Sequence, residues 1–250
     1  MVNQLLDCQL VLPVKSALKS LSRLILSDCN DGIEIQTDLL NHASFFLSTD
    51  SDILIGRSLS VFLDVFRISN EDLINSLIHT KIFEFIRNPL IHENSTLQAS
   101  ASYLLVKLVA SNKQFEEIAL SSDLIDIICK NALDSEFKSR EQAVSTICEF
   151  IQCRHSVSMI EHIKNCGGLL AISVALGGAT DENAKDIINA VHHVVTQMPC
   201  EMDTFLEYGL LNELEDILST PDELLSDDVF NAADTLREEI ISYLNAENVE

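Results

Sequence analysis

Tryptophan is absent from this chain of 250 residues, and glycine and proline are scarce, with seven and four residues respectively. A protein of many strands joined by tight turns would need more of both turn-forming residues. Leu, Ile, Ala, Ser, Asp and Glu dominate instead, and 47% of the residues are hydrophobic. This composition favours helices that each bury at least one face.

Long apolar runs are also missing. No uncharged apolar run reaches the roughly 18 residues that a membrane-spanning helix needs. The closest segments, residues 53–66 and 97–110, are interrupted by Arg57 and Lys107. The first ten residues contain Asp7 and no basic residue, which argues against a secretory signal peptide. We therefore expect no membrane span and a cytoplasmic or nuclear location.

Basic residues are few. The 16 Lys and Arg stand against 39 Asp and Glu, and the net charge is −23. We expect no nucleic-acid partner, because a phosphate backbone requires a basic face. Residues 201–250 hold 15 of the acidic side chains and a single basic one, Arg237, for a net charge of −14. This charge predicts a protein partner that carries a basic segment.

The residues typical of metal and catalytic sites do not occur in the required patterns. The seven cysteines include no Cys-x-x-Cys pair, and a buried thiol packs as a small hydrophobic group. His192 and His193 are adjacent on a predicted helix and point about 100° apart, so they do not share one ion. The spacing gives no Ser–His–Asp order and no nucleophile turn. We expect no metal, no cofactor and no enzymatic activity.

The chain contains internal repeats. Each copy has a short apolar segment, a polar loop and a longer amphipathic segment, and the equivalent first positions are Leu40, Ile82, Leu124, Leu169 and Leu210. Their spacings of 42, 42, 45 and 41 residues are typical of repeats of two or three helices. Segments 71–81, 114–122, 156–166 and 201–208 fit a third, short helix. Gly168 and Gly209 mark a tight turn after two of these segments.

This layout resembles the armadillo repeat family over residues 39–244. The features that carry the resemblance are the short helix, the glycine turn, a Leu-Leu-x-x-Leu-like helix, a polar loop and a long helix. It implies an all-α, right-handed α-solenoid of about five to six repeats in a single domain, residues 1–250. The expected repeats are a partial one at 1–38, four at 39–81, 82–123, 124–167 and 168–208, and a capping repeat at 209–250.

The resemblance also implies candidate contact residues. In peptide-binding members of the family, the long helix presents a Trp and, four residues later, an Asn to the peptide. The Trp position is held here by Ser60, Tyr103, Ser145, Asn189 and Asp234, and the Asn position by Asp64, Lys107, Glu149, His193 and Glu238. These replacements argue against recognition of an extended basic peptide in the manner of import adaptors. They predict a groove of mixed charge, with candidate partner contacts at Asp64, Tyr103, Lys107, Glu149, Asn189 and His193. Lys107 and Glu149 either pair laterally or are ordinary solvated helix positions.

The acidic last repeat has two interpretations. One is a docking face for a basic segment, with contacts at Glu213, Glu215, Asp216 and Asp222. The other is a solubilising cap, whose carboxylates lie near helix N-termini where anions are favoured.

The function expected from these features is a protein–protein interaction scaffold or adaptor. It would bind its partner through the concave groove or through the acidic C-terminal face. One alternative is a nucleotide-exchange-like cofactor of Hsp70-type chaperones, since short armadillo proteins of this size resemble the chain. Another is a structural subunit that self-assembles. We expect a monomer, with a homo-oligomer as the alternative.

The repeat register gives a first testable prediction. The long helices should begin near Ser95, Ser139, Asn183 and Asp227, which places Leu105, Ile147, Val191 and Leu236 in one core-facing column. Asp at any of these four positions should lower the Tm sharply or abolish folding, because a buried, unpaired carboxylate is costly. Thermal unfolding measures this loss. Exposure of about half or more for two of the four side chains would contradict the register.

Overall fold

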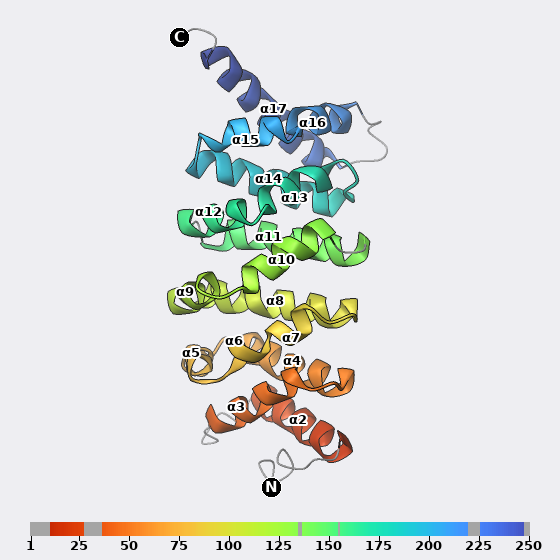
Figure 1. Ribbon diagram of the computed structural model, residues 1–250, viewed down its shortest axis with the longest axis vertical. Coiled ribbons are helices and arrows are strands. Elements are labelled where there is room, and N and C mark those ends of the chain that lie inside the picture. The colour runs from red at the N-terminus through yellow and green to blue at the C-terminus, as the bar shows by residue number, and fades with distance from the viewer. Residues whose placement is uncertain (1–10, 28–36, 135–136, 155, 220–225, 248–250) are drawn as a thin grey trace. The chain divides into compact units, whose positions relative to one another are not determined.

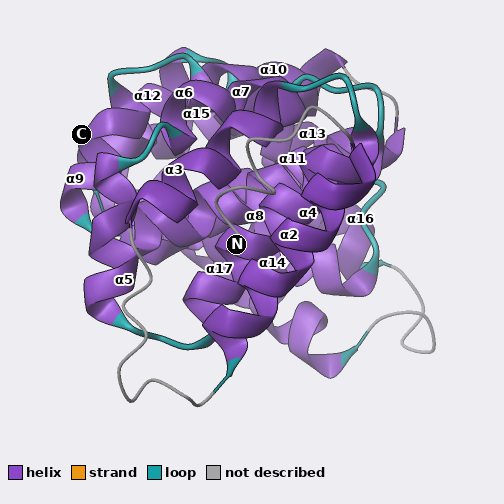
Figure 2. Cartoon of the chain, turned by 90° about the horizontal axis from the view of Figure 1, so that it is seen from below, coloured by secondary structure: helices purple, strands orange, loops and turns teal. Residues whose placement is uncertain are grey.

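The computed structural model describes residues 11–27, 37–134, 137–154, 156–219 and 226–247. Within these ranges the secondary structure is helical and includes no strand (Figures 1 and 2). Contacts between residues divide the chain into two compact units, unit 1 at residues 1–127 and unit 2 at residues 128–250. The single domain expected over residues 1–250 stays a prediction.

Unit 1 is built from long helices with shorter ones between them. Its long helices are α2 (Val11–Leu26), α4 (Asp52–Arg67) and α8 (Ser95–Ser111), and α4 packs against both others (Figure 1). The shorter elements are α3 (Thr37–Phe45), η1 (Phe46–Ser48), α5 (Glu71–Ser76), η2 (Leu77–His79), α6 (Ile82–Phe85), α7 (Arg87–Leu90) and α9 (Lys113–Leu120). The helix α10 (Leu124–Asp134) begins in this unit and continues past residue 127.

Unit 2 repeats the same order of elements. Its long helices are α11 (Phe137–Arg154), α14 (Asp181–Gln197) and α17 (Asp227–Glu247), and α14 packs against both others (Figure 1). The shorter ones are α12 (Val157–Asn165), α13 (Gly168–Leu176), α15 (Glu201–Glu207) and α16 (Leu210–Leu218). The short third helices predicted from the sequence are confirmed by α5 with η2, α9, α12 and α15.

Side-chain caps explain where several helices begin. The Asn70 Oδ1 accepts a hydrogen bond from the Leu73 amide at the start of α5, over 3.0 Å. Asn94 and Asn112 do the same at α8 and α9, and Ser156 caps α12. Each cap satisfies an amide that the helix itself leaves without an acceptor.

The predicted core column is confirmed. Leu105, Ile147 and Val191 are 0% exposed and Leu236 is 1% exposed. The predicted starts at Ser95 and Asp227 are also confirmed, whereas α11 and α14 begin two residues before the predicted starts, at Phe137 and Asp181.

Polar bonds within each unit join residues about one repeat apart. In unit 1 the Asn94 side chain donates to Asp52 across 42 positions. In unit 2 the Asn183 side chain donates to Glu141 across 42 positions, and the Ser226 amide donates to Asp181 across 45. These bonds fix the register between successive repeats, because each partner is the equivalent loop or helix start of the next copy.

The predicted turn at Gly209 is confirmed, and the one at Gly168 is displaced by one residue. Gly209 and Gly167 have φ angles of 82° and 79°, in the left-handed region that favours glycine. Gly168 instead lies buried at the start of α13. A Cβ atom there would lie 2.5 Å from Cγ2 of Ile163. Gly168 is therefore needed for close packing rather than for the turn.

The helices of the described ranges are not of the membrane-spanning type. No helix there combines the length and the apolar character that crossing a membrane requires.

The turn glycine gives a second prediction. Gly209→Ala should destabilise the chain by about 1–2 kcal/mol, because an alanine is strained in the left-handed conformation of this position. The added methyl group itself meets no other atom. Gly178→Ala is the matched control, since nothing lies within 4 Å of its added methyl group either and its φ is not in that region. The control should be neutral or slightly stabilising. Chemical denaturation of both variants measures the difference, and equal effects would refute the role of the φ angle.

Candidate functional site

An open groove of about 850 Å³ lies in unit 1, between the C-terminal halves of α4 and α8 and the start of α5. We call it the α4–α8 groove. It is lined by Leu63, Phe66, Arg67, Ser69, Glu71, Ile74, Asn75, Tyr103, Lys107, Ala110, Ser111 and Asn112. Two of the residues predicted to contact a partner, Tyr103 and Lys107, are therefore together in one concave surface.

Tyr103 and Lys107 form a cation–π pair on α8. The Lys107 Nζ lies 4.8 Å from the centre of the Tyr103 ring, within the range of this attraction. Tyr103 is 43% exposed, so part of the ring is open to a ligand while the lysine covers another part. The two residues are one helical turn apart, which is why the sequence spacing alone could predict their common face.

Asp64 is not available to a partner, and this prediction is corrected. It is 2% exposed, and its carboxylate accepts hydrogen bonds from Ser22 and from Nη1 of Arg67, the latter over 2.7 Å. The position four residues after Ser60 thus faces α2 rather than solvent. Its physical role is to hold Arg67, whose side chain lines the groove.

Two amide side chains lie at the edge of the α4–α8 groove. The Asn112 Nδ2 donates to the Asn75 Oδ1 over 2.8 Å, and the Asn112 Oδ1 also caps α9. Both side chains are therefore held in place, and amide groups of this kind can bond the backbone of an extended segment.

The predicted contact residues of unit 2 are less clearly a site. Asn189 is exposed on α14, whereas Glu149 on α11 and His193 on α14 are half-buried and have interactions of their own. None of the three lines the cavity of unit 2 described below.

Three carboxylates of the acidic segment 201–250 contact basic groups of the repeat that precedes each of them. Lys164 donates to the buried Glu201 over 2.6 Å, and this hydrogen bond raises the pKa of Lys164. Lys185 donates to Asp228 over 2.6 Å, a bond that raises the pKa of Lys185 and lowers that of Asp228. His192 lies 3.1 Å from Glu239. Glu201, Asp228 and Glu239 thus serve contacts between repeats.

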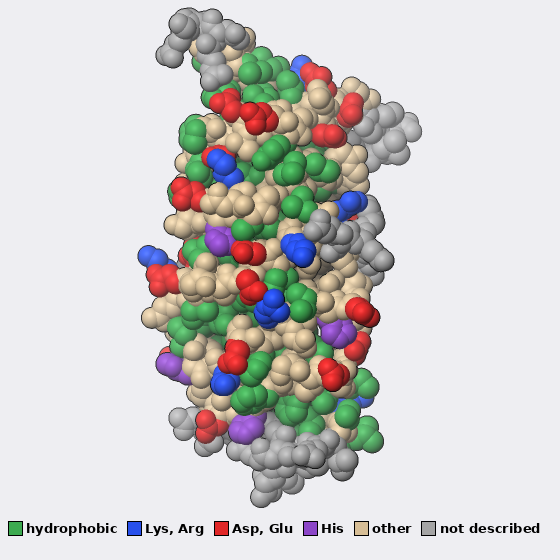
Figure 3. All heavy atoms as spheres, in the orientation of Figure 1, with side chains coloured by type: hydrophobic (Ala, Val, Ile, Leu, Met, Phe, Trp, Pro, Cys, Tyr) green, Lys and Arg blue, Asp and Glu red, His purple; other side chains and the backbone are tan. Residues whose placement is uncertain are grey.

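The four carboxylates proposed as a docking face are not equally accessible. Glu215 and Asp216 are exposed on α16, and Glu213 is half-buried against Gly177. Asp222 lies outside the described residues. On the visible face, acidic side chains around α15 and α16 form several separate groups (Figure 3).

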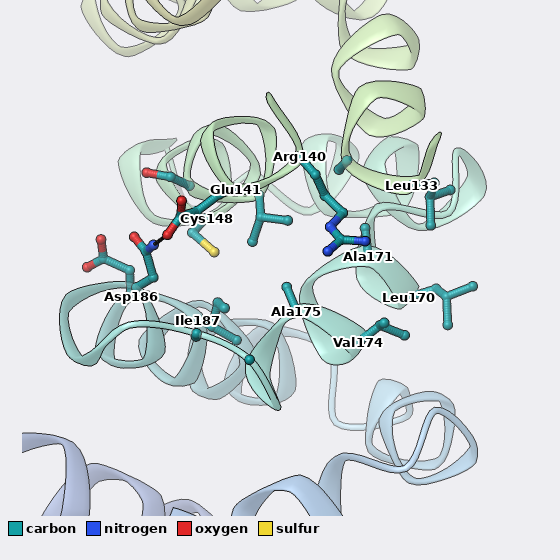
Figure 4. Close-up of a pocket in the computed structure, with 16 residues that line it drawn as sticks. Leu133, Arg140, Glu141, Cys148, Leu170, Ala171, Val174, Ala175, Asp186 and Ile187 are labelled. Atoms are coloured by element: carbon teal, nitrogen blue, oxygen red, sulfur yellow. Dashed lines mark hydrogen bonds between the residues drawn. The ribbon is translucent and has the colours of Figure 1, made fainter. Parts of the chain in front are cut away.

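A second cavity, which the sequence did not predict, lies inside unit 2. We call it the unit 2 cavity; its volume is about 200 Å³, and it is formed by α10, α11, α13 and α14 (Figure 4). Its lining consists of Ala132, Leu133, Arg140, Glu141, Val144, Ser145, Cys148, Leu170, Ala171, Val174, Ala175, Gly178, Ala179, Asn183, Asp186 and Ile187. The sequence contains one indication of this cavity. The α13 segment, GLLAISVAL, is apolar on nearly every side, and this is more apolar surface than a helix that packs through one face would need.

Two titratable groups of the unit 2 cavity have shifted pKa values. Burial raises the pKa of Asp186, and the nearby charge of Glu182 adds to this. Burial, followed by the charges of Asp186 and Glu149, raises the pKa of the Cys148 thiol far above its ordinary range. Cys148 therefore stays a neutral thiol at physiological pH and is a poor nucleophile.

Comparison with known proteins found similarity at the level of structure alone. No protein-family model and no curated protein matches the chain. Among solved structures, computationally designed armadillo repeat proteins for modular peptide recognition match with a TM-score of 0.76, 17% identity and coverage of 96% of this chain and 98% of theirs. A designed armadillo repeat protein in complex with the peptide (KR)4 matches with a TM-score of 0.76, 17% identity and coverage of 96% and 97%. The chain has the armadillo-repeat fold.

This result confirms the all-α armadillo-like solenoid expected from the repeats. A further designed armadillo repeat protein agrees, with a TM-score of 0.73, 18% identity and coverage of 96% and 98%. Identities this low establish the fold and leave the partner to be argued from the chain's own residues.

The raised pKa of Asp186 gives a third prediction. A carboxyl pKa above the ordinary 3.8 means that the folded chain disfavours the charged form, so the charge lowers stability at neutral pH. Asp186→Asn should therefore raise the Tm at neutral pH, and this advantage should shrink as the pH falls through the raised pKa toward about 4. Thermal unfolding across this range tests the prediction. Glu207→Gln, at an exposed carboxylate, is the control, and its Tm should not exceed that of the wild type at neutral pH. An Asp186→Asn variant that is less stable than the wild type at neutral pH would contradict the prediction.

Proposed function

We propose that the chain is a non-catalytic scaffold or adaptor that binds a protein partner, with the α4–α8 groove as its main contact surface. One observation carries this proposal: Tyr103, Lys107 and Arg67 converge on a single open groove of unit 1. The armadillo fold supports it, since the designed proteins with this fold are described as peptide-recognition scaffolds.

The chemistry of the groove favours an extended segment of the partner. Tyr103 offers a half-exposed ring, which suits contact residues because it combines area with a polar tip. Asn75 and Asn112 offer amides for the partner's backbone. Arg67 is paired with Asp64, and Lys107 is balanced by Glu71 along the lining, so this groove has no excess of acidic charge that would favour a basic stretch.

We further propose that a basic segment of the partner contacts the acidic last repeat instead. The net charge of −14 over residues 201–250 supports this, as do the exposed carboxylates Glu215 and Asp216. One structural neighbour, a designed armadillo repeat protein, is in complex with the basic peptide (KR)4, which supports a basic segment in the partner. The proposal includes a cytoplasmic or nuclear location, where buried thiols such as Cys129 and Cys148 stay reduced.

The groove is tested by selecting random linear peptides on the wild-type chain and measuring their Kd for variants. Tyr103→Ala and Lys107→Ser should each weaken groove-bound peptides, by about tenfold for Tyr103→Ala if it is a hot spot. Lys113→Ser is the matched control, because Lys113 is exposed in the same unit and does not line the groove. Peptides whose affinity is equal for all of these variants would overturn the groove.

The acidic repeat is tested with peptides of the same selection that contain several basic residues. Replacing Glu213, Glu215, Asp216 and Asp222 together by Ser or Asn should weaken them while the helical content is kept. Their wild-type affinity should also fall as salt rises, since such attraction acts over about 8 Å at physiological salt. Affinity that responds to neither change would leave the last repeat as a cap.

A further inference from the structure

The unit 2 cavity is separate from the groove of the proposed function. It lies between α10 and α13, which are equivalent short helices of two successive repeats, and α11 and α14, the long helices that follow them. A volume of about 200 Å³ exceeds that of the roughly 150 Å³ protein cavities that take up a small aromatic molecule. The cavity is therefore large enough for an organic group rather than for a single water.

Part of the cavity lining is apolar. Val144, Val174 and Ile187 contribute branched side chains, and Ala171 and Ala175 keep the space between them open. Val174 is 62% exposed although it is apolar, which places a hydrophobic surface at the opening. An alkyl chain that contacts these side chains would remove part of Val174 from water, and the free energy gained is proportional to the apolar area buried.

One side of the cavity carries the acidic groups. Figure 4 shows Glu141, Cys148 and Asp186 gathered there, with Arg140 and Leu133 on the other side. Glu141 accepts a hydrogen bond from the Asn183 side chain over 2.5 Å. Asp186 is half-buried, and its carboxylate has no hydrogen-bond or ion-pair partner in the described part of the chain.

The partners of these groups decide which charge the cavity accepts. An anion beside Glu141 and Asp186 would add a third negative charge in a partly desolvated place. A cation there would give Asp186 the partner that it lacks, and charge-assisted bonds of this kind are stronger than neutral ones. Arg140 already has interactions of its own, and it lies across the cavity from Asp186 (Figure 4).

We propose that the unit 2 cavity binds an unbranched aliphatic chain that ends in an ammonium group. The chain lies along Val144, Val174 and Ile187, and the ammonium group donates to Asp186 and to Glu141. The same chemistry is offered by a lysine side chain of a protein and by a small primary amine. No covalent step is involved, and Cys148 forms only part of the lining.

The test follows the methyl resonances of Val144, Val174 and Ile187 by NMR while n-pentylammonium is added to the full chain. Saturable shifts of these methyl groups are expected. The neutral 1-pentanol and the anionic pentanoate have the same chain length and should bind at least about tenfold more weakly, because they lack the charge-assisted bonds.

Two variants and one control separate the effect of the charge from the effect of the space. Asp186→Asn should weaken pentylammonium by about tenfold or more and leave 1-pentanol unchanged. Glu207→Gln removes the same charge at an exposed site outside the cavity and should leave both affinities unchanged. Ala175→Leu fills the cavity and should abolish binding of both ligands. Circular dichroism confirms that each variant is folded before it is titrated.

The source of the ammonium group is decided by a second pair of probes. N-acetyl-lysine methylamide carries the lysine side chain on a backbone unit, and the norleucine analogue lacks only the amine. Binding of the lysine probe indicates a protein-borne lysine, whereas binding of pentylammonium alone indicates a small amine.

The proposal is overturned if pentylammonium binds no better than 1-pentanol or pentanoate, or if Asp186→Asn leaves the affinity for pentylammonium unchanged. Because all readouts lie in unit 2, failure here is independent of the groove experiment.

Discussion

The packing of each unit depends on one constraint: its long helices are apolar on more than one side, so a single neighbour cannot cover them. The α8 helix shows this plainly, with Leu104, Leu105, Leu108 and Val109 all 0% exposed. Consecutive residues point about 100° apart, and such a helix must be enclosed from several directions. In unit 1 the flanking α4, α7 and α9 provide that cover. Repetition is therefore a physical requirement of these sequences, because a lone repeat would leave a large apolar area in water.

The acidic charge of the chain has a second use once the repeats are stacked. Glu201 is buried in unit 2, and a buried carboxylate is stable only with a partner, which Lys164 of the preceding repeat supplies. Asp64 in unit 1 is neutralised by Arg67 and bonded to Ser22, 42 positions earlier. The buried apolar side chains determine which helices pack together, and these polar pairs determine how successive repeats are aligned. Net charge alone is thus a poor guide to which carboxylates can meet a partner.

The sequence predicted what depends on periodicity, and it failed where the direction of one side chain matters. The four residues of the core column follow from a repeat of 41–45 residues, and all are buried. Tyr103 and Lys107 follow from the resemblance to peptide-binding armadillo proteins, and their one-turn spacing puts them on one face of the helix. The resemblance places Asp64 on the same face, yet the packing of α4 against α2 buries it. The unit 2 cavity could not be predicted in its position and size, because it depends on the space that side chains of four separate helices leave between them.

The bonds between residues one repeat apart have a consequence for how such a chain can gain or lose length. An added or deleted segment of one complete repeat keeps the helix starts in register, because the partners of Asn183 and Glu201 lie 42 and 37 positions earlier, in the preceding repeat. Loss of half a repeat that includes α12 would break this register, remove Lys164 and leave Glu201 as an uncompensated charge in the interior. Whole repeats are therefore the natural units of recombination in this chain, and its loops are the places where a breakpoint does least damage.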